Sequence, residues 1–158
     1  QKLGEAEVMA DAGLDDILLT FNLLGAAKLR RLVALARRVR MSVTVDSDVT
    51  ARGLDAAMIE AGLKLDVLIE CDTGGQRCGV QNPEEVVALA KLIDRAPGLS
   101  FCGLMTYPAK GQTEITQAWL ADALQALGIA GMTAQRVSTG GTPDLYRAHH
   151  VTAATPRW

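Results

Sequence analysis

The sequence predicts an α/β fold of about five parallel strand–helix units. Short β-branched or apolar runs alternate with helical patterns about every 25–35 residues, a spacing typical of βαβ units. The predicted strands are apolar on both faces, as in parallel sheets that are covered by helices. Hydrophobic residues make up 49% of the chain and charged residues 22%, a balance that fits a packed core and not a disordered chain.

Capping residues set the limits of the predicted helices. Gly13, Gly62 and Gly128 each follow a helical pattern and can adopt the left-handed conformation that ends a helix. Asp48 is placed to cap the third helix, and Asn82-Pro83 with two following acids is a strong helix start. The predicted helices cover 3–12, 24–38, 49–61, 82–94 and 113–127, and the predicted strands cover 16–21, 41–45, 65–71, 99–105 and 132–137. After residue 143 the pattern fades.

Two architectures satisfy this alternation, namely a doubly wound sheet and a (β/α)8 barrel. A complete barrel takes about 250 residues, so a barrel made of five units would have pieces missing. No break in composition divides the chain, and we expect one incomplete domain over residues 1–158. The chain runs into a helical pattern without a targeting signal, which indicates a start inside the fold, and we interpret residues 156–158 as a junction artefact.

Charge and cysteine content exclude several classes of function. The 16 basic and 18 acidic residues give a net charge of −2, which argues against nucleic-acid binding. No apolar run approaches about 18 residues, so we expect no membrane-spanning helix. Cys71, Cys78 and Cys102 are odd in number and match neither a disulfide framework nor a zinc-ligand spacing, which fits a cytoplasmic location.

Polar residues follow every predicted strand. Because the carboxyl ends of parallel strands meet at one edge of a sheet or barrel, we expect the functional residues at that edge. The segments that follow the five strands are Asn22, 46–48, 71–79, 106–111 and 138–143. The last three are rich in glycine and in hydrogen-bonding groups, and they are the candidates for a binding site.

The segment Ser138–Pro143 (STGGTP) has the features of a phosphate cradle. Its two glycines allow backbone N–H groups to approach an anion closely, and the flanking hydroxyls add donors. Pro143 opens a predicted short helix whose N-terminal dipole would favour a phosphate. The segment lacks the Walker spacing and lysine, so it is not an ordinary nucleotide-binding loop. The alternative is a tight turn followed by a capped helix.

Arg77 and Tyr107 are the other two candidate ligand-binding residues. Arg77 lies in the glycine-rich segment DTGGQRCG (72–79), where a guanidinium could hold a phenolate, carboxylate or phosphate. Its alternative role is an ion pair with Asp72 in a surface loop. Tyr107 directly follows an apolar strand and could stack on a planar ligand or donate a hydrogen bond to it. Its alternative role is that of a core tyrosine with a satisfied hydroxyl.

The basic residues near the second helix, the histidine pair and two cysteines are interpreted as structural and not as functional features. We interpret the basic residues on and after the second helix as a solvated outer face. His149-His150 is insufficient for a metal site, and Cys71 and Cys78 are interpreted as small buried thiols, not nucleophiles. The basic residues are Lys28, Arg30, Arg31, Arg37, Arg38 and Arg40.

Four stretches together resemble the N-terminal barrel of fold-type III pyridoxal phosphate (PLP) enzymes, in particular the D-threonine aldolase and D-serine dehydratase-like family related to alanine racemase. The resemblance covers roughly residues 2–147 and implies a partial TIM barrel, (β/α)8, of the alanine racemase N-terminal type. It also implies retro-aldol cleavage or β-elimination of D-β-hydroxy amino acids, with PLP as electron sink. The four stretches are EAEVMADAGLDDIL (5–18), LDVLIECDTGGQRCGV (65–80), FCGLMTYPAKG (101–111) and VSTGGTPDL (137–145).

The resemblance also implies roles for individual residues. Arg77 is similar to the arginine that faces the phenolic oxygen of the cofactor, and Tyr107 to a cofactor-contacting tyrosine. The phosphate cradle of the family corresponds to Thr139, Gly140, Gly141 and Thr142. A parent enzyme of this kind would take a small D-amino acid as substrate and form a homodimer.

The sequence departs from the family at its catalytic lysine. The Schiff-base lysine of the family lies on the first strand in a His-x-Lys-Thr-His-like context, and no such motif occurs here. The first strands, the last strand and the C-terminal β-domain, which would carry a divalent metal such as Mn or Zn, are also missing. We therefore expect a fragment without catalytic or metal-binding residues of its own. The lysines of the chain are Lys2, Lys28, Lys64, Lys91 and Lys110.

Three functional hypotheses follow from these observations. The first is an incomplete PLP-dependent aldolase or dehydratase barrel. The second is a non-enzymatic PLP-binding or carrier barrel, and the third is an α/β domain that uses Ser138–Pro143 to bind a sugar phosphate or nucleotide. An open barrel would leave two parallel edges, so we expect aggregation, dimerisation through an edge, or completion by another chain.

Overall fold

The computed structural model describes residues 2–153 and contains the predicted alternation of helices and strands. The expectation for residues 156–158 lies outside the described residues. None of the described helices is long and apolar enough to cross a membrane. The helices are α1 (Leu3–Asp11), α2 (Ala26–Ala36), α3 (Asp48–Ala61), α4 (Pro83–Arg95), α5 (Thr113–Ile129) and the 3-10 helix η1 (Thr142–His150), and the strands are β1 (Asp16–Leu19), β2 (Arg40–Val45), β3 (Leu65–Glu70), β4 (Leu99–Met105) and β5 (Arg136–Ser138).

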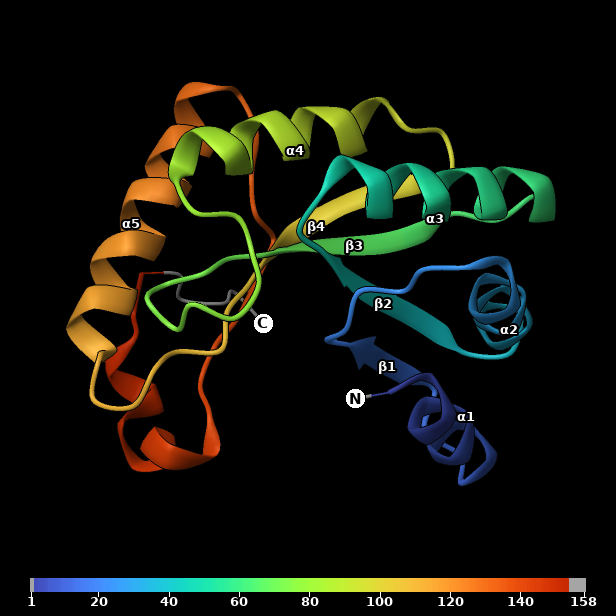
Figure 1. Cartoon of the computed structure of the whole chain (residues 1–158), viewed down its shortest axis with the longest axis horizontal. Helices are drawn as coiled ribbons and strands as arrows, with labels where there is room; N and C mark the ends of the chain where they lie inside the picture. Colours follow the sequence, from blue (N-terminus) through green and yellow to red (C-terminus); the bar gives the residue numbers. More distant parts are fainter. Residues whose placement is uncertain (1, 154–158) are drawn as a thin grey trace.

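The five strands form one parallel sheet in the order β1-β2-β3-β4-β5. This sequential order is that of a (β/α)8 barrel and differs from a doubly wound sheet, in which the order reverses at a switch point. The sheet curls into a half-barrel, and the helices lie along its outer side (Figure 1). The prediction of a partial barrel is therefore confirmed.

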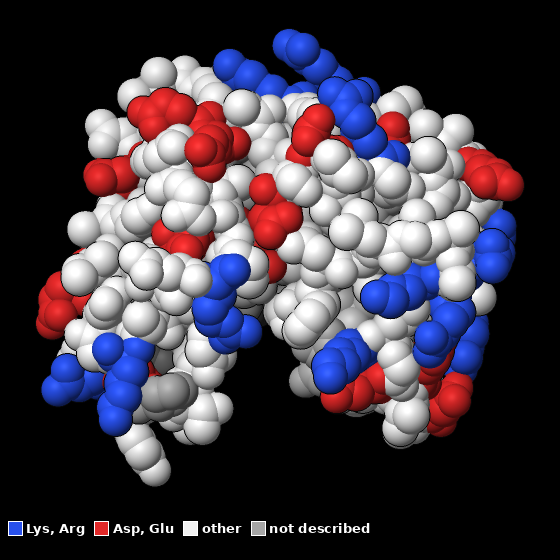
Figure 2. All heavy atoms as spheres, in the orientation of Figure 1, with Lys and Arg blue, Asp and Glu red and all other residues white. Residues whose placement is uncertain are grey.

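The two faces of the sheet have different environments. The main core lies between the sheet and the helices and includes fully buried Val43, Val67 and Leu104 from neighbouring strands. A smaller cluster of Leu68, Cys102 and Met105 is separate from it. Because adjacent strand residues point to opposite faces, Leu68 lies on the inner, concave face. Figure 2 shows the hollow that this curvature leaves in the molecule.

An ion-pair network ties three strands together. Asp66 of β3 accepts hydrogen bonds from Arg40 of β2 at 3.1 Å and from Arg136 of β5 at 3.0 Å. Arg136 also donates to the Ser42 hydroxyl at 3.2 Å. Asp66 is thus bonded to an arginine that lies 70 positions later in the sequence. Arg40 was expected, with the basic residues of the preceding helix, on a solvated outer face. Its side chain is 61% exposed, but it begins β2 and pairs with Asp66 of β3, because the sheet register sets the direction of a strand residue.

The other residues of the basic set behave largely as expected. Arg31 pairs with Glu7 of α1 at 2.5 Å, and Arg38 pairs with Asp11 of the same helix. Arg37 donates to the carbonyl of Ala61 at 2.7 Å. These exposed groups interleave with acidic side chains over α1 and α2 (Figure 2), so they form a solvated helix surface.

β3 ends one residue earlier than predicted, at Glu70, and two other strands are shortened further. β1 ends at Leu19, and Phe21 is half exposed. β5 begins at Arg136, not at Met132. The N–H of Met132 donates back to the Leu127 carbonyl at 2.9 Å, so the chain is still leaving α5 at that point. Contact with β4 begins only at Gln135, whose N–H donates to the Cys102 carbonyl.

The helix caps differ from the prediction at two positions. Ser47, not Asp48, is the N-cap of α3, because its hydroxyl accepts the hydrogen bond from the Thr50 N–H. Gly128 lies inside α5, which continues to Ile129. The predicted caps Asn82 and Gly62 are confirmed: the Asn82 side chain accepts from the Glu85 N–H at 2.9 Å, and Gly62 has a φ of 65°.

Candidate functional site

Three loops meet at the carboxyl edge of the sheet, after β3, β4 and β5. The N–H of Cys71 donates to the Met105 carbonyl at 2.8 Å, and the N–H of Thr106 donates to the Ser138 carbonyl at 2.9 Å. These bonds extend the β3–β4 and β4–β5 pairing past the strand ends. The predicted binding segments therefore start side by side, and we call this edge the loop rim.

Arg77, Tyr107 and the Gly140-Gly141 turn come together on the loop rim. The guanidinium carbon of Arg77 lies 5.2 Å from the centroid of the Tyr107 ring, within cation–π range. A Cβ atom added to Gly141 would lie 2.9 Å from the Tyr107 Cζ, so the glycine lets the backbone approach the ring closely. Tyr107 is 45% exposed, which rules out the alternative of a core tyrosine.

Asp72 organises the loop that carries Arg77. Its Oδ1 accepts hydrogen bonds from the N–H groups of Gly74 and Gln76, both at 3.0 Å, and its Oδ2 accepts one from Gln81 at 3.4 Å. Burial raises the pKa of Asp72, but these donors outweigh it and leave the pKa below its ordinary value of 3.8. Among the described residues, no ion pair joins Asp72 to Arg77, so the guanidinium is not engaged by this carboxylate.

The low pKa of Asp72 predicts that acid opens this loop. Because the folded-state pKa lies below the unfolded value, the stabilisation is present above about pH 4 and is lost as the pH falls through the folded pKa. As the pH is lowered below about 4, we expect the amide hydrogens of Gly74 and Gln76 to exchange faster than the intrinsic pH dependence of exchange predicts. Exchange measured by NMR in the wild type and in Asp72→Asn checks this, since the variant should have lost the effect. If the exchange rates, corrected for their intrinsic pH dependence, change with pH equally in both proteins, this prediction is contradicted.

Three buried threonines connect the loops to α5. The hydroxyls of Thr73 and Thr106 lie 2.9 Å apart, and the hydroxyl of Thr116 donates to Thr73 at 3.3 Å. All three side chains are at most 2% exposed. Thr73 and Thr106 lie in predicted binding segments, but none of the three was predicted as a site residue, because isolated threonines carry no local signal for a network that spans 43 positions.

Unpartnered polar atoms occur in segments that follow three of the strands. Within residues 2–153, three buried side-chain oxygens without a hydrogen-bond partner belong to Asn22, Gln112 and Thr139. They follow β1, β4 and β5, respectively, in the chain. A buried oxygen without a partner is costly, so these atoms are candidates for contacts with water or a ligand. Thr139 belongs to the predicted phosphate cradle.

The end of the predicted cradle differs from expectation. Thr142 begins η1, a 3-10 helix that is broken at Asp144, where φ is −123°. Its peptide dipoles are therefore not aligned as in a continuous α-helix, and the contribution expected from a helix N-terminus is weak. The side chain of Asp144 instead accepts a hydrogen bond from the Gly111 N–H, which connects this segment to the loop after β4. An anion bound by this segment would therefore be contacted by the backbone and hydroxyls of Thr139–Thr142.

Two further expectations concern possible catalytic or metal-binding groups. Cys71 is buried as expected, but Cys78 is an exposed residue whose sulfur lies 3.0 Å from the Glu70 carboxylate. Partial burial and this carboxylate raise the pKa of the Cys78 thiol to about 11, which makes it a poor nucleophile. The described residues contain no group of three or more potential metal ligands, and all five lysines are exposed.

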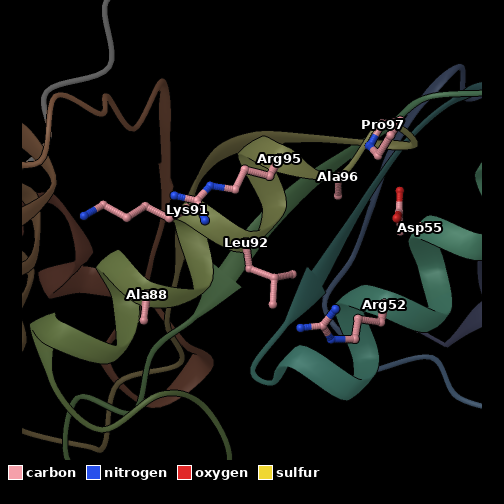
Figure 3. A pocket seen from close by; sticks show the side chains of 8 residues that line it. All are labelled: Arg52, Asp55, Ala88, Lys91, Leu92, Arg95, Ala96 and Pro97. Carbon is pink, nitrogen blue, oxygen red and sulfur yellow. The ribbon is translucent and has the colours of Figure 1, made fainter.

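A separate pocket lies between α3 and α4, near the start of β4 (Figure 3). Its charged lining consists of Arg52, Lys91, Arg95 and Asp55. Lys91 extends away from Arg52, so these cations do not converge on one point. Asp55 accepts a hydrogen bond from the Gly98 N–H at 2.8 Å and serves the turn before β4. The pocket therefore offers weaker ligand geometry than the loop rim.

The sequential parallel half-barrel, with its loops gathered at one edge, is the fold of the alanine racemase N-terminal domain class. The family "alanine racemase, N-terminal domain" matches residues 1–156, so the chain belongs to this family. Pyridoxal phosphate is implied by that membership.

Individual relatives are lyases. The chain is 38% identical to a D-threonine aldolase from Arthrobacter sp. over 89% of its own length and 38% of that enzyme. The structure of a D-threonine aldolase from Filomicrobium marinum superposes with a TM-score of 0.91 at 34% identity, covering 97% of this chain and 44% of the other. The D-threo-3-hydroxyaspartate dehydratase from Delftia sp. HT23 gives a TM-score of 0.84 at 28% identity, covering 98% and 44%. The chain thus spans less than half the length of these relatives.

Proposed function

We propose that the loop rim binds the phosphate and ring of PLP in a protein that acts on D-β-hydroxy amino acids. The observation that carries the proposal is the convergence of Arg77, Tyr107 and Gly141, which come from three separate segments. The unpartnered Thr139 hydroxyl adds a donor at the same edge. A planar, doubly anionic ligand matches this combination of a guanidinium, an aromatic face and a glycine turn.

The residues of this chain would hold the ligand by distinct contacts. The guanidinium of Arg77 donates hydrogen bonds to an anionic ring oxygen, and its charge stabilises that oxygen in the ionised form. Tyr107 provides an aromatic surface beside the ring. The Thr139 and Thr142 hydroxyls, together with the N–H groups of Gly140 and Gly141, surround the phosphate. When bound, the cofactor supplies an electron sink for bond cleavage next to the amino group of the substrate.

The wider activity belongs to the same proposal. The aldolase and dehydratase relatives support either carbon–carbon cleavage or loss of water from a D-amino acid in the whole protein. We propose a homodimer, a cytoplasmic location and a divalent metal for that whole protein. The exposed lysines of this chain match no family lysine, so we propose that this chain alone forms no productive covalent bond with PLP.

Calorimetry with three ligands tests the binding proposal. Pyridoxine 5′-phosphate is the main probe, because it lacks the aldehyde that would react with exposed lysines. We expect it to bind at least about tenfold more tightly than glucose 6-phosphate or inorganic phosphate, since only the ring can contact Arg77 and Tyr107. Equal affinities would support the hypothesis of a general phosphate-binding domain, and no measurable binding of any ligand would contradict both.

A further inference from the structure

We propose that Glu70 is a positioning residue that holds Arg77 in place through the Cys78 side chain. The inference deepens the proposed function, because Arg77 is the cation assigned to the ligand. Neither Glu70 nor Cys78 was selected from the sequence as a contributor to ligand binding.

The environment of Glu70 is unusual for a carboxylate. Glu70 ends β3 and is 6% exposed, and the described residues provide no ion pair to it. Its Oε1 accepts from the Cys78 thiol at 3.0 Å, and its Oε2 accepts from the Thr44 hydroxyl at 3.4 Å. Burying a carboxylate with only neutral donors costs stability. An apolar side chain would fill this position at lower cost, so the carboxylate has a role other than stability.

The position of Arg77 in its loop indicates that role. The ends of the loop are joined by the Cys71–Val80 bridge, with the Val80 N–H donating to the Glu70 carbonyl at 2.9 Å. On one side of Arg77, the Gln76 N–H is held by Asp72 at 3.0 Å. On the other side, Cys78 is held by Glu70 at 3.0 Å.

Arg77 is therefore the residue between two neighbours that are each fixed by a carboxylate. Gln76 has a φ of 50°, a left-handed conformation that a non-glycine residue adopts only when its surroundings enforce it. Loss of the Cys78 contact would leave Arg77 fixed on one side only. The guanidinium would then spend less time over Tyr107, where the proposed ligand contact lies.

Tryptic cleavage after Arg77 measures this positioning without a ligand. Trypsin reaches the Arg77–Cys78 bond only when the loop opens, so the cleavage rate reports the open population. We expect Cys78→Ala and Glu70→Gln to raise the rate about tenfold relative to cleavage after Arg52 in α3. Cys78→Ser restores a donor to Glu70 and should return the rate to within about twofold of wild type. Glu60→Gln, an exposed acid on α3, controls for the change in charge.

Affinity for pyridoxine 5′-phosphate is the second measurement. Cys78→Ala and Glu70→Gln should each weaken binding by about three- to tenfold, and Cys78→Ser should restore it. Because both changes break the same contact, the double variant Glu70→Gln/Cys78→Ala should bind no more weakly than the single variant with the lower affinity. Unchanged cleavage and affinity in Cys78→Ala would overturn the proposal, as would a Cys78→Ser variant that behaves like Cys78→Ala. If Glu70→Gln does not fold, the comparison of Cys78→Ala with Cys78→Ser still tests whether the contact between Cys78 and Glu70 positions Arg77. If the wild type does not bind the probe, the proposed function fails, while the cleavage rates still judge the role of Glu70.

Discussion

Replacing Gly103 by alanine is expected to unfold the protein or to lower its free energy of unfolding by about 3 kcal/mol or more. Gly103 lies in β4 at φ 153°, opposite Arg136 of β5. A Cβ atom at this position would lie 1.8 Å from the Arg136 carbonyl oxygen, a backbone atom that cannot move without breaking the β4–β5 pairing. Since β5 leads directly into the predicted phosphate cradle, ligand binding should be lost together with stability.

Thermal and urea unfolding, followed by circular dichroism, measure this effect. Gly128→Ala is the matched control, because it makes the same chemical change inside α5, where nothing lies within 4 Å of the added Cβ. That control should be neutral or stabilise the protein by up to about 1 kcal/mol. A Gly103→Ala protein with the same midpoint as wild type would show that the β4–β5 approach is looser than the structure indicates.

Replacing Arg77 by alanine is expected to weaken pyridoxine 5′-phosphate binding by about 10- to 100-fold, the usual range for a charge-assisted hydrogen bond. Arg77→Lys should recover only part of this loss, since an ammonium group lacks the planar pair of donors. The fold should be unaffected, because the Arg77 side chain is exposed and forms no ion pair among the described residues.

Arg52→Ala is the control for the choice of site. Arg52 lines the pocket between α3 and α4, away from the loop rim. Calorimetry should show wild-type affinity in this variant. If Arg52→Ala weakens binding as much as Arg77→Ala does, or if Arg77→Ala has no effect, the ligand does not occupy the loop rim.

The features that the sequence predicted correctly depend on local signals. The alternation of helices and strands follows from hydrophobic periodicity, and the Asn82 cap follows from a side chain that bonds a backbone N–H three residues later. The meeting of Arg77, Tyr107 and Gly141 was also predictable, because parallel strands in sequential order bring their following loops to one edge.

The features that the sequence did not predict depend on pairs of residues that are distant in the chain. Glu70 and Thr44 are 26 positions apart, and Thr116 and Thr73 are 43 apart. Arg40 was grouped with the basic residues on and after the second predicted helix, while its partner, Asp66, lies on a neighbouring strand. The early start predicted for β5 had a related cause, since Met132 is still hydrogen-bonded to the end of α5 and bonding to β4 begins only at Gln135.

By itself, the sequence determined the order of elements, the edge at which the loops gather and the family to which the chain belongs. These properties are encoded in residues close together in the chain, by periodicity, capping and glycine placement. Only the tertiary structure decided which buried polar groups touch, that Cys78 lies against Glu70, and that Tyr107 is exposed beside Arg77. Those contacts depend on how strands that are distant in the chain align and on how the sheet curves, because both bring together residues that have no common local pattern.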